Sequence, residues 1–178
     1  MKSLFESFTP ILMGEASAPN DPTDVRNDPA KPKGTYAAYR LDKETEEDLD
    51  GFLETCGLHH INTSEGKIRS VKRHVTLMYS RKVHDDYQPN KNLTHSARCK
   101  GYAMYGNALV MLLDCPSLEE RHHEIHRKHG ATYDFPTYNP HVSLHYGDLP
   151  VGFTVHTLPM FGGEITLCDE YKEDLKDD

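Results

Sequence analysis

The chain has 178 residues, of which 37% are hydrophobic, and a formal net charge of −8 at pH 7. This length suits one domain, or one domain with a tail, and the hydrophobic content is enough for a core without surplus. The negative charge argues against a protein that coats long nucleic acid, because such binding depends on neutralising many phosphates, but it allows a small phosphorylated ligand in a local pocket.

The sequence carries no clear signal for export or membrane insertion. Residues 1–18 imitate a signal peptide, but polar residues and a proline interrupt the segment that would have to be continuously apolar. No apolar run is long enough to span a membrane. The four cysteines form no Cys-x-x-Cys pair, which excludes a zinc ribbon and a redox motif: Cys56, Cys99, Cys115 and Cys168. We therefore expect reduced thiols in a cytosolic protein.

The composition changes near residue 34. Between Gly14 and Gly34, Pro, Asp, Asn and Lys dominate, and such a segment buries too little apolar surface to offset the entropy of ordering. We expect residues 1–33 to be a flexible N-terminal segment. Residues 34–178 are expected to form a single domain that ends in a short acidic tail.

A predicted strand and helix open this domain. Alternation of apolar and polar residues over positions 36–41 predicts a strand. The more polar face of this strand carries three side chains: Tyr36, Ala38 and Arg40. Asp42 is a good N-cap for a helix over residues 43–56, where apolar side chains recur at helical spacing, and Gly57 supplies the stop.

The next predicted strand contains the sequence His74-Val75-Thr76-Leu77-Met78-Tyr79. Its alternation places His74 and Thr76 on one face and Val75, Leu77 and Tyr79 on the other. The basic stretch 67–73 comes directly before it. In an acidic protein this stretch indicates where an anion approaches, and a solvated loop is the alternative interpretation.

A hairpin and a second helix follow. Gly106-Asn107 separates two apolar segments, residues 96–105 and 108–113, which predicts a pair of antiparallel strands. Ser117 is the expected N-cap of a helix through about residue 128, and Gly130 ends it. Because the strongly apolar residues of this helix are few, we expect it to lie shallowly on the sheet.

Four histidines on this helix raise the question of a metal site: His122, His123, His126 and His129. The zinc-protease motif requires His-Glu-x-x-His, and here Glu124 is followed too soon by His126. His122 and His126 lie one turn apart, but no acidic or sulfur ligand is obvious nearby. We expect a structural or solvent-facing role and no metal.

The segment 131–140 carries Tyr133, Phe135 and Tyr138 among prolines and polar residues. These aromatic rings either clamp a base by stacking or pack as an ordinary loop. The second motif strand, His141-Val142-Ser143-Leu144-His145-Tyr146, follows directly. It repeats the first motif, with His141 and Ser143 on one face and an aliphatic back that includes Tyr146 on the other.

Two strands that each present an imidazole beside a hydroxyl suit attack on a phosphodiester. One imidazole accepts a proton from the attacking oxygen while the other gives a proton to the leaving oxygen. The hydroxyls of Thr76 and Ser143 would hydrogen-bond the non-bridging phosphoryl oxygens, where charge gathers. Nothing in this scheme requires a metal. A single His-x-Thr strand would be structural, whereas the matched pair favours function.

Residues 164–171 read as a closing strand, so the order is strand, helix, strand, hairpin, helix, strand, strand. The paired motifs resemble the signature of the two-histidine (2H) phosphoesterases. Within that group the chain is most similar to the phage anti-CBASS nucleases, over about residues 34–175. That likeness rests on the two motifs, on Gly34-Thr35-Tyr36 and on Glu170-Tyr171-Lys172-Glu173-Asp174-Leu175.

The resemblance implies an α+β fold with two pseudo-symmetric lobes, which form a concave antiparallel sheet with helices on the outer faces. It implies a catalytic set of His74, Thr76, His141 and Ser143. Ser143 stands where many family members have Thr, and it keeps the hydroxyl. Tyr36 and Glu170 are the implied substrate-binding residues, with Glu170 reading an adenine edge.

The resemblance also implies a function. The expected protein is a metal-independent phosphodiesterase, without a cofactor, that cleaves cyclic di- and trinucleotides such as 3′,3′-cyclic GMP-AMP to block CBASS defence in the cytosol of the infected host. The ribose 2′-hydroxyl would attack the adjacent phosphate. The partner is this small substrate, with no long nucleic acid and no membrane.

Two other functions remain open. A 2H enzyme with the same residues can instead act on 2′,5′-oligoadenylate or RNA 2′,3′-cyclic phosphate. A non-catalytic sponge for cyclic nucleotides is expected to have lost a histidine or a hydroxyl, which is not seen here. The sequence leaves open the base preference, the histidine that acts first as a base, and the oligomeric state.

Overall fold

The structure is a computed structural model, and it describes residues 34–58, 73–147 and 149–175. Within these residues the chain forms six strands, two α-helices and a short 3-10 helix. In chain order they are β1 (Thr35–Leu41), α1 (Lys43–Thr55), β2 (His74–Ser80), β3 (His95–Tyr105), β4 (Ala108–Asp114), α2 (Pro116–His129), β5 (His141–Tyr146), η1 (Val155–Thr157) and β6 (Glu164–Asp174). The predicted order of strands and helices is confirmed. The N-terminal segment, residues 67–72 of the basic stretch and the end of the acidic tail lie outside the described residues.

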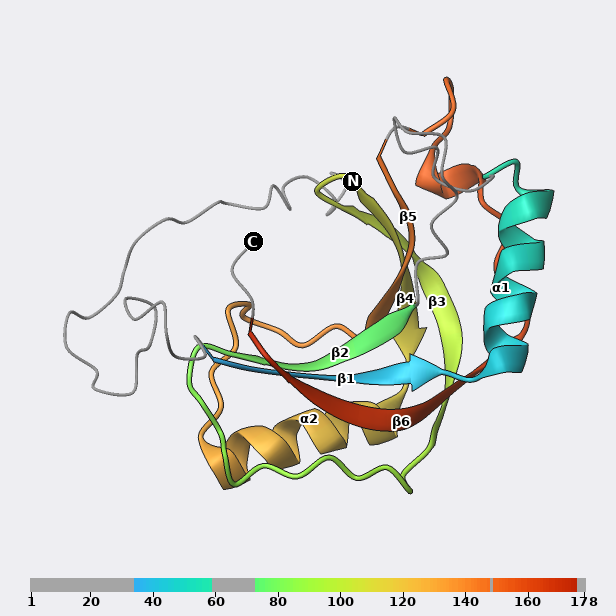
Figure 1. Cartoon of the computed structure of the whole chain (residues 1–178). Helices are drawn as coiled ribbons and strands as arrows, with labels where there is room; N and C mark the ends of the chain where they lie inside the picture. Colours follow the sequence, from blue (N-terminus) through green and yellow to red (C-terminus); the bar gives the residue numbers. More distant parts are fainter. Residues whose placement is uncertain (1–33, 59–72, 148, 176–178) are drawn as a thin grey trace, which may run out of the picture.

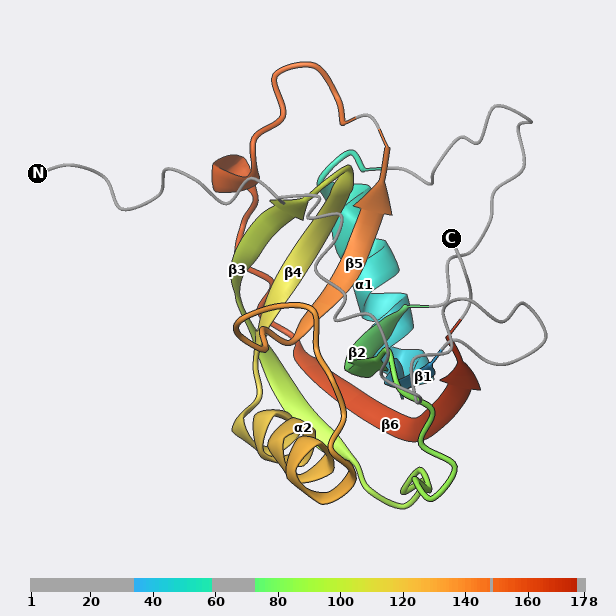
Figure 2. The ribbon, with the colours of Figure 1, turned by 90° about the vertical axis from the view of Figure 1, so that its left-hand side faces the viewer.

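The strands form one antiparallel sheet in the order β1-β2-β5-β4-β3-β6, and β6 returns to pair with β1, so the sheet closes on itself. The two seams that join β2 to β5 and β3 to β6 differ in width. The first consists of the pair Val75 and Val142, whereas the second has four pairs. Both helices lie on the outer side of the curved sheet (Figure 1; Figure 2). The expected outer position of the helices is confirmed, and the expected concave sheet closes into a barrel.

Each motif strand contains a β-bulge at the same position. The register passes from Ala38 opposite Thr76 to Ala37 opposite Met78, which leaves Leu77 without a partner on β1. On β5 the register with β4 skips Leu144 in the same way. A bulge inserts one extra residue and so changes which face the following side chains occupy.

The two bulges correct one prediction. Tyr79 and Tyr146 were expected on the buried face, with the Val and Leu side chains. Instead Met78 and His145 are buried, Tyr79 is half-buried and Tyr146 is 38% exposed. The simple alternation holds as far as the Leu of each motif and fails after it, because the bulge adds a residue there.

The ends of the helices follow local chemistry. The side chain of Asp42 accepts a hydrogen bond from the backbone N–H of Thr45 at 2.9 Å, so the predicted cap and helix α1 are confirmed. The predicted cap of α2 is wrong. That helix begins at Pro116, which fits the first turn because its missing N–H is not needed there, and the Ser117 hydroxyl instead contacts His95 Nδ1 at 2.7 Å. Gly130 ends α2 in the left-handed conformation, as predicted.

The core lies between the sheet and the helices. Helix α1 buries Leu49 and Leu53, and α2 buries Leu118, Ile125 and also His122. This small buried set agrees with a helix that lies shallowly on the sheet, and it includes a histidine beside two aliphatic side chains. Among the helices in the described residues, none is long and apolar enough to cross a membrane.

Candidate active site

The two motif strands meet where Val75 of β2 pairs with Val142 of β5. Both valines are fully buried, and the residues on either side of them point to the opposite face and are half-buried: His74, Thr76, His141 and Ser143. In an antiparallel pair of this register, His74 neighbours Ser143 and Thr76 neighbours His141. The two histidines are then diagonal neighbours, about 7 to 8 Å apart in a regular sheet. The structure thus brings the four motif residues together on one face.

The ring of His141 has a defined hydrogen-bonding state. Its Nδ1 lies 2.8 Å from the backbone carbonyl oxygen of Asn139. Because a carbonyl oxygen accepts and never donates, Nδ1 carries the proton, and in the neutral ring Nε2 keeps its lone pair. The Tyr105 ring contacts His141 edge-on, with 4.9 Å between ring centroids. His141 is therefore fixed in the tautomer that a proton acceptor at Nε2 requires.

The pKa of His141 also favours a ring that can accept a proton. Burial lowers the pKa of His141 below its ordinary value, and the positive charge of His74 lowers it further, against the opposing effect of the hydrogen bond to Asn139. The influence of His74 shows that the two imidazoles lie within electrostatic reach of each other. Near neutral pH, His141 is thus held in its unprotonated form.

Tyr36 lies with the motif residues of β2. Its hydroxyl is 3.1 Å from Thr76 Oγ1, and its ring contacts the His74 ring edge-on with 6.0 Å between centroids. Burial raises the pKa of Tyr36 far above its ordinary range, so the hydroxyl keeps its proton. The structure therefore places Tyr36 beside the His74 and Thr76 side chains.

Glu170 lies elsewhere. It is fully buried, and each carboxylate oxygen accepts two hydrogen bonds. Oε2 accepts from Tyr39 at 2.5 Å and from Arg121 Nε at 3.2 Å, and Oε1 accepts from Tyr87 and from Arg121 Nη2 at 3.0 Å. Burial alone would raise the pKa of Glu170, but these hydrogen bonds outweigh it and hold the pKa below its usual value. The structure does not bring Glu170 together with the motif residues, because it faces α2, which carries Arg121.

One histidine of α2, His122, packs against the first motif strand. His122 Nδ1 donates to the Leu77 carbonyl at 2.7 Å, and its ring stacks on the Tyr138 ring with 3.8 Å between centroids. The structural role expected for His122 is thus confirmed. Across the described ranges, no group of three or more His, Cys, Asp or Glu residues is arranged to hold a metal ion. In the aromatic segment, Tyr138 is buried, as a packed loop requires, whereas Phe135 is 63% exposed.

Two residues of this face were not singled out from the sequence. Arg40 of β1 pairs directly with His74, and its guanidinium lies over the Tyr171 ring, 4.5 Å from the centroid. The alternation of β1 already placed Arg40 on the face of Tyr36, and that was the available signal. Tyr171 belongs to the C-terminal stretch that carries the resemblance, but strand alternation did not place it on this face, because a bulge at Asp169 changes the alternation of β6 before it.

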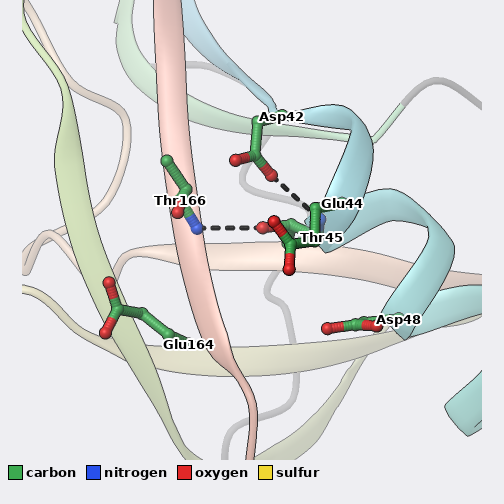
Figure 3. A pocket seen from close by; sticks show the side chains of 6 residues that line it. All are labelled: Asp42, Glu44, Thr45, Asp48, Glu164 and Thr166. Atoms are coloured by element: carbon green, nitrogen blue, oxygen red, sulfur yellow. Dashed lines mark hydrogen bonds between the residues drawn. The ribbon is translucent and has the colours of Figure 1, made fainter.

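A hollow lies at the N-terminus of α1 (Figure 3). It is lined by Asp42, Glu44, Thr45, Asp48, Glu164 and Thr166. The carboxylate of Asp42 and the hydroxyl of Thr45 are hydrogen-bonded to backbone N–H groups. A surface lined by four carboxyl groups repels a phosphate, so this hollow does not suit a phosphorylated substrate.

Comparison with known proteins identifies relatives over most of the chain. Residues 33–178 match the protein family described as Anti-CBASS protein Acb1. The protein of that description from Acinetobacter phage Ac42 is 37% identical over 147 residues, which cover 80% of this chain and 91% of the relative. The one from Vibrio phage KVP40 is 32% identical over 148 residues, which cover 80% and 88%. The one from Enterobacteria phage T4 is 36% identical over 110 residues, which cover 59% and 68%.

Proposed function

Because this chain belongs to the anti-CBASS protein Acb1 family of phage proteins, we propose that it is a phosphodiesterase that cleaves cyclic di- and trinucleotides, such as 3′,3′-cyclic GMP-AMP. By removing such signals in the cytosol of an infected host, it would block CBASS antiphage defence. One observation carries the proposal. Two imidazoles and two hydroxyls flank the Val75 and Val142 pair on a single face of the sheet.

The proposed first step is intramolecular. The ribose 2′-hydroxyl attacks the adjacent phosphorus, its proton passes to His141 Nε2, and the bond from phosphorus to the 5′-oxygen breaks. His74 gives its proton to that leaving oxygen, and a 2′,3′-cyclic phosphate forms. The assignment of His141 as the base rests on its lowered pKa and on Nδ1 donating to Asn139. The hydroxyls of Thr76 and Ser143 hydrogen-bond the non-bridging oxygens, where negative charge develops.

The 2H-like organisation of two related lobes is part of the proposal. The chain repeats the order strand, helix, strand, strand, first as β1, α1, β2 and β3 and then as β4, α2, β5 and β6. Exchanging the members of the two sets leaves the strand order of the barrel unchanged. The matching bulges at Leu77 and Leu144 support the same relationship.

We also propose that the reaction needs no metal. The work that a metal would do here is proton transfer and the stabilisation of charge on the phosphoryl oxygens. Two imidazoles cover the first, and hydroxyl donors on both strands cover the second.

A panel of substrates tests the proposal. The protein is incubated in EDTA with cyclic dinucleotides, cyclic trinucleotides, 2′,5′-oligoadenylate and RNA that ends in a 2′,3′-cyclic phosphate. Hydrolysis of the cyclic oligonucleotides is expected, and cyclic dinucleotides with 2′-O-methyl sugars should bind and stay intact. Cleavage restricted to the other two substrates would assign a different 2H activity. Tight binding without any cleavage would instead indicate a sponge, and activity restored by zinc after EDTA treatment would contradict metal independence.

A further inference from the structure

The face of the sheet that carries the four motif residues, the motif face, also carries an arginine, Arg40. Arg40 pairs with His74 across β1 and β2, so both side chains project from the same face of the sheet. The Arg40 side chain is 43% exposed. Its guanidinium lies over the Tyr171 ring, and that ring lies 6.3 Å from the Tyr36 ring between centroids. A positive charge therefore stands beside the proposed reaction centre and has access to solvent.

The orientation of Arg40 is fixed from β6. Its Nε donates to Asp169 Oδ2 at 3.0 Å. Asp169 occupies the bulge between Glu170 and Cys168 and has a φ of 50°, a left-handed conformation that Asp tolerates better than most residues. The contact uses Nε, while Nη1 and Nη2 carry the four donors whose planar fork matches phosphate oxygens. Ring and carboxylate together hold this fork in place.

Two other arginines close to the site are turned away from it. Arg73 directly precedes His74, but its guanidinium donates to Glu46 and Asp50 of α1, at 2.6 Å in each case, and its side chain is 10% exposed. Arg121 is committed to the buried carboxylate of Glu170. Arg40 is also paired with a carboxylate, that of Asp169, but its side chain is 43% exposed and the contact uses only Nε, so its Nη groups can still bind an anion.

The substrate class creates a need for such a charge. This step rests on the proposed function. A cyclic dinucleotide carries two phosphodiesters and a cyclic trinucleotide three, and the two motifs act on one of them at a time. Each remaining phosphate keeps a full negative charge in a chain of net charge −8. An unpaired phosphate near such a protein is unfavourable, and a guanidinium is the side chain best suited to bind it.

We propose that Arg40, held over the Tyr171 ring and oriented by Asp169, binds a phosphodiester of the substrate that is not being cleaved. Arg40 then contributes to binding equally before and during the reaction. Loss of its side chain should raise KM and leave kcat nearly unchanged. The residue also makes affinity depend on the number of phosphates in the ligand, independently of which base is present.

The test compares two ligands that differ by one phosphate. The first is a cyclic dinucleotide with 2′-O-methyl sugars, and the second is the linear dinucleoside monophosphate with the same bases and sugars. Both are titrated calorimetrically against wild type, Arg40→Gln and Arg98→Gln. Arg98 is an exposed arginine of β3, so its substitution makes the same change in net charge at a position that pairs with neither motif strand. Arg40→Lys, which keeps the charge and loses the fork, provides a second variant.

Arg40→Gln should weaken the cyclic ligand by about 10- to 100-fold, the range for loss of a charge-assisted hydrogen bond. The linear ligand should change by less than about 3-fold, as for a neutral surface substitution. Arg98→Gln should alter neither, and Arg40→Lys should fall between wild type and Arg40→Gln. Equal weakening of both ligands, or an unchanged affinity for the cyclic one, would overturn the role of Arg40.

Hydrolysis of the unmodified cyclic dinucleotide by the wild-type protein is measured in parallel. If wild type does not cleave it, the proposed function fails and the role of Arg40 fails with it. If wild type cleaves it while Arg40→Gln retains full affinity for the uncleavable cyclic ligand, the role of Arg40 fails alone.

Discussion

Tyr138 donates its hydroxyl to the backbone carbonyl of Thr76 at 2.8 Å, so the segment before the second motif holds the first motif in place. The next residue, Asn139, accepts the hydrogen bond from His141. The carbonyls of Thr76 and Leu77, at the bulge in β2, accept hydrogen bonds from the side chains of Tyr138 and His122. One short segment thus sets the positions of both motif strands.

The first prediction concerns this contact. Tyr138→Phe removes the hydroxyl and keeps the ring that stacks on His122, so the carbonyl of Thr76 loses its donor and the Thr76 hydroxyl its fixed position. We expect kcat to fall by about 3- to 10-fold, the scale of one hydrogen bond, with little change in KM. Steady-state kinetics on a cyclic dinucleotide give both values.

Tyr102→Phe is the matched control. Its hydroxyl also donates to a backbone carbonyl, that of Pro159 at 2.9 Å, on the part of β3 that faces α1. It should leave kcat unchanged. A similar fall in kcat for both variants would show that Tyr138 acts through general stability rather than by positioning Thr76.

The second prediction concerns the two motif histidines. Replacing His74 or His141 with Ala should lower kcat by about 100-fold or more, because each removes a positioned acid or base. The double variant should be little worse than either single one, since the two groups act in one step. His123→Ala, on the exposed face of α2, is the control. Near wild-type rates in both single variants would rule out the proposed proton transfers.

The third prediction is a titration. Burial and the charge of His74 lower the pKa of His141, so its ring should stay unprotonated to a pH below the ordinary histidine value of about 6.5. His74→Gln removes the repelling charge, and the pKa of His141 should therefore rise. NMR titration of the His141 ring protons in both proteins measures this directly and does not depend on turnover. An unchanged or lowered pKa in the variant would show that the imidazoles are not coupled.

The same shift fixes the sign of the pH effect on stability. The folded state holds His141 less protonated than the unfolded state does, so folding is favoured at pH values above about 6.5. This contribution decreases as the pH falls below that value toward the lowered pKa of the folded state. Burial likewise lowers the pKa of His122, to about 4, which adds a change of the same sign over roughly pH 6.5 to 4.

The fourth prediction separates two roles for Glu170. Its carboxylate is buried and paired with Arg121, so Glu170→Gln leaves this largely buried guanidinium with only the half-exposed carboxylate of Glu124 as a counter-charge. The free energy of unfolding should fall by about 3 to 5 kcal/mol, the usual result of breaking a buried pair, as measured by urea unfolding. The affinity of the folded variant for adenine-containing cyclic dinucleotides should not change. A selective loss of adenine affinity with full stability would return Glu170 to the substrate-binding role that the sequence implied.

Several features of the fold and the site follow from local sequence. The N-cap at Asp42, the turn at Gly106-Asn107 and the stop at Gly130 each depend on a few neighbouring residues. The placement of an imidazole and a hydroxyl on one face of each motif strand requires regular strand alternation over only three residues. The bulges at Leu77 and Leu144 lie beyond that reach, because they arise from the register with β1 and β4.

Glu170 shows why its placement could not be read from the chain. Glu170 stands in a strand whose register shifts by one residue at Asp169, and a shift of one residue moves every following side chain to the opposite face. Its partner Arg121 lies 49 positions away on α2. Neither the register shift nor that distant contact has a signature in the sequence around Glu170.

The unequal seams of the barrel bear on its mechanics. Spreading β2 from β5 would break one ladder pair, whereas parting β3 from β6 would break four. The least resistant line in the sheet therefore runs between His74 and His141. Cyclic substrates of two and of three nucleotides would require different distances between the two imidazoles. Such a change would break the fewest ladder pairs between β2 and β5 and would leave the pairing of β3 with β6 intact. The seam with the fewest ladder pairs thus lies between the two imidazoles that are proposed to act on the substrate.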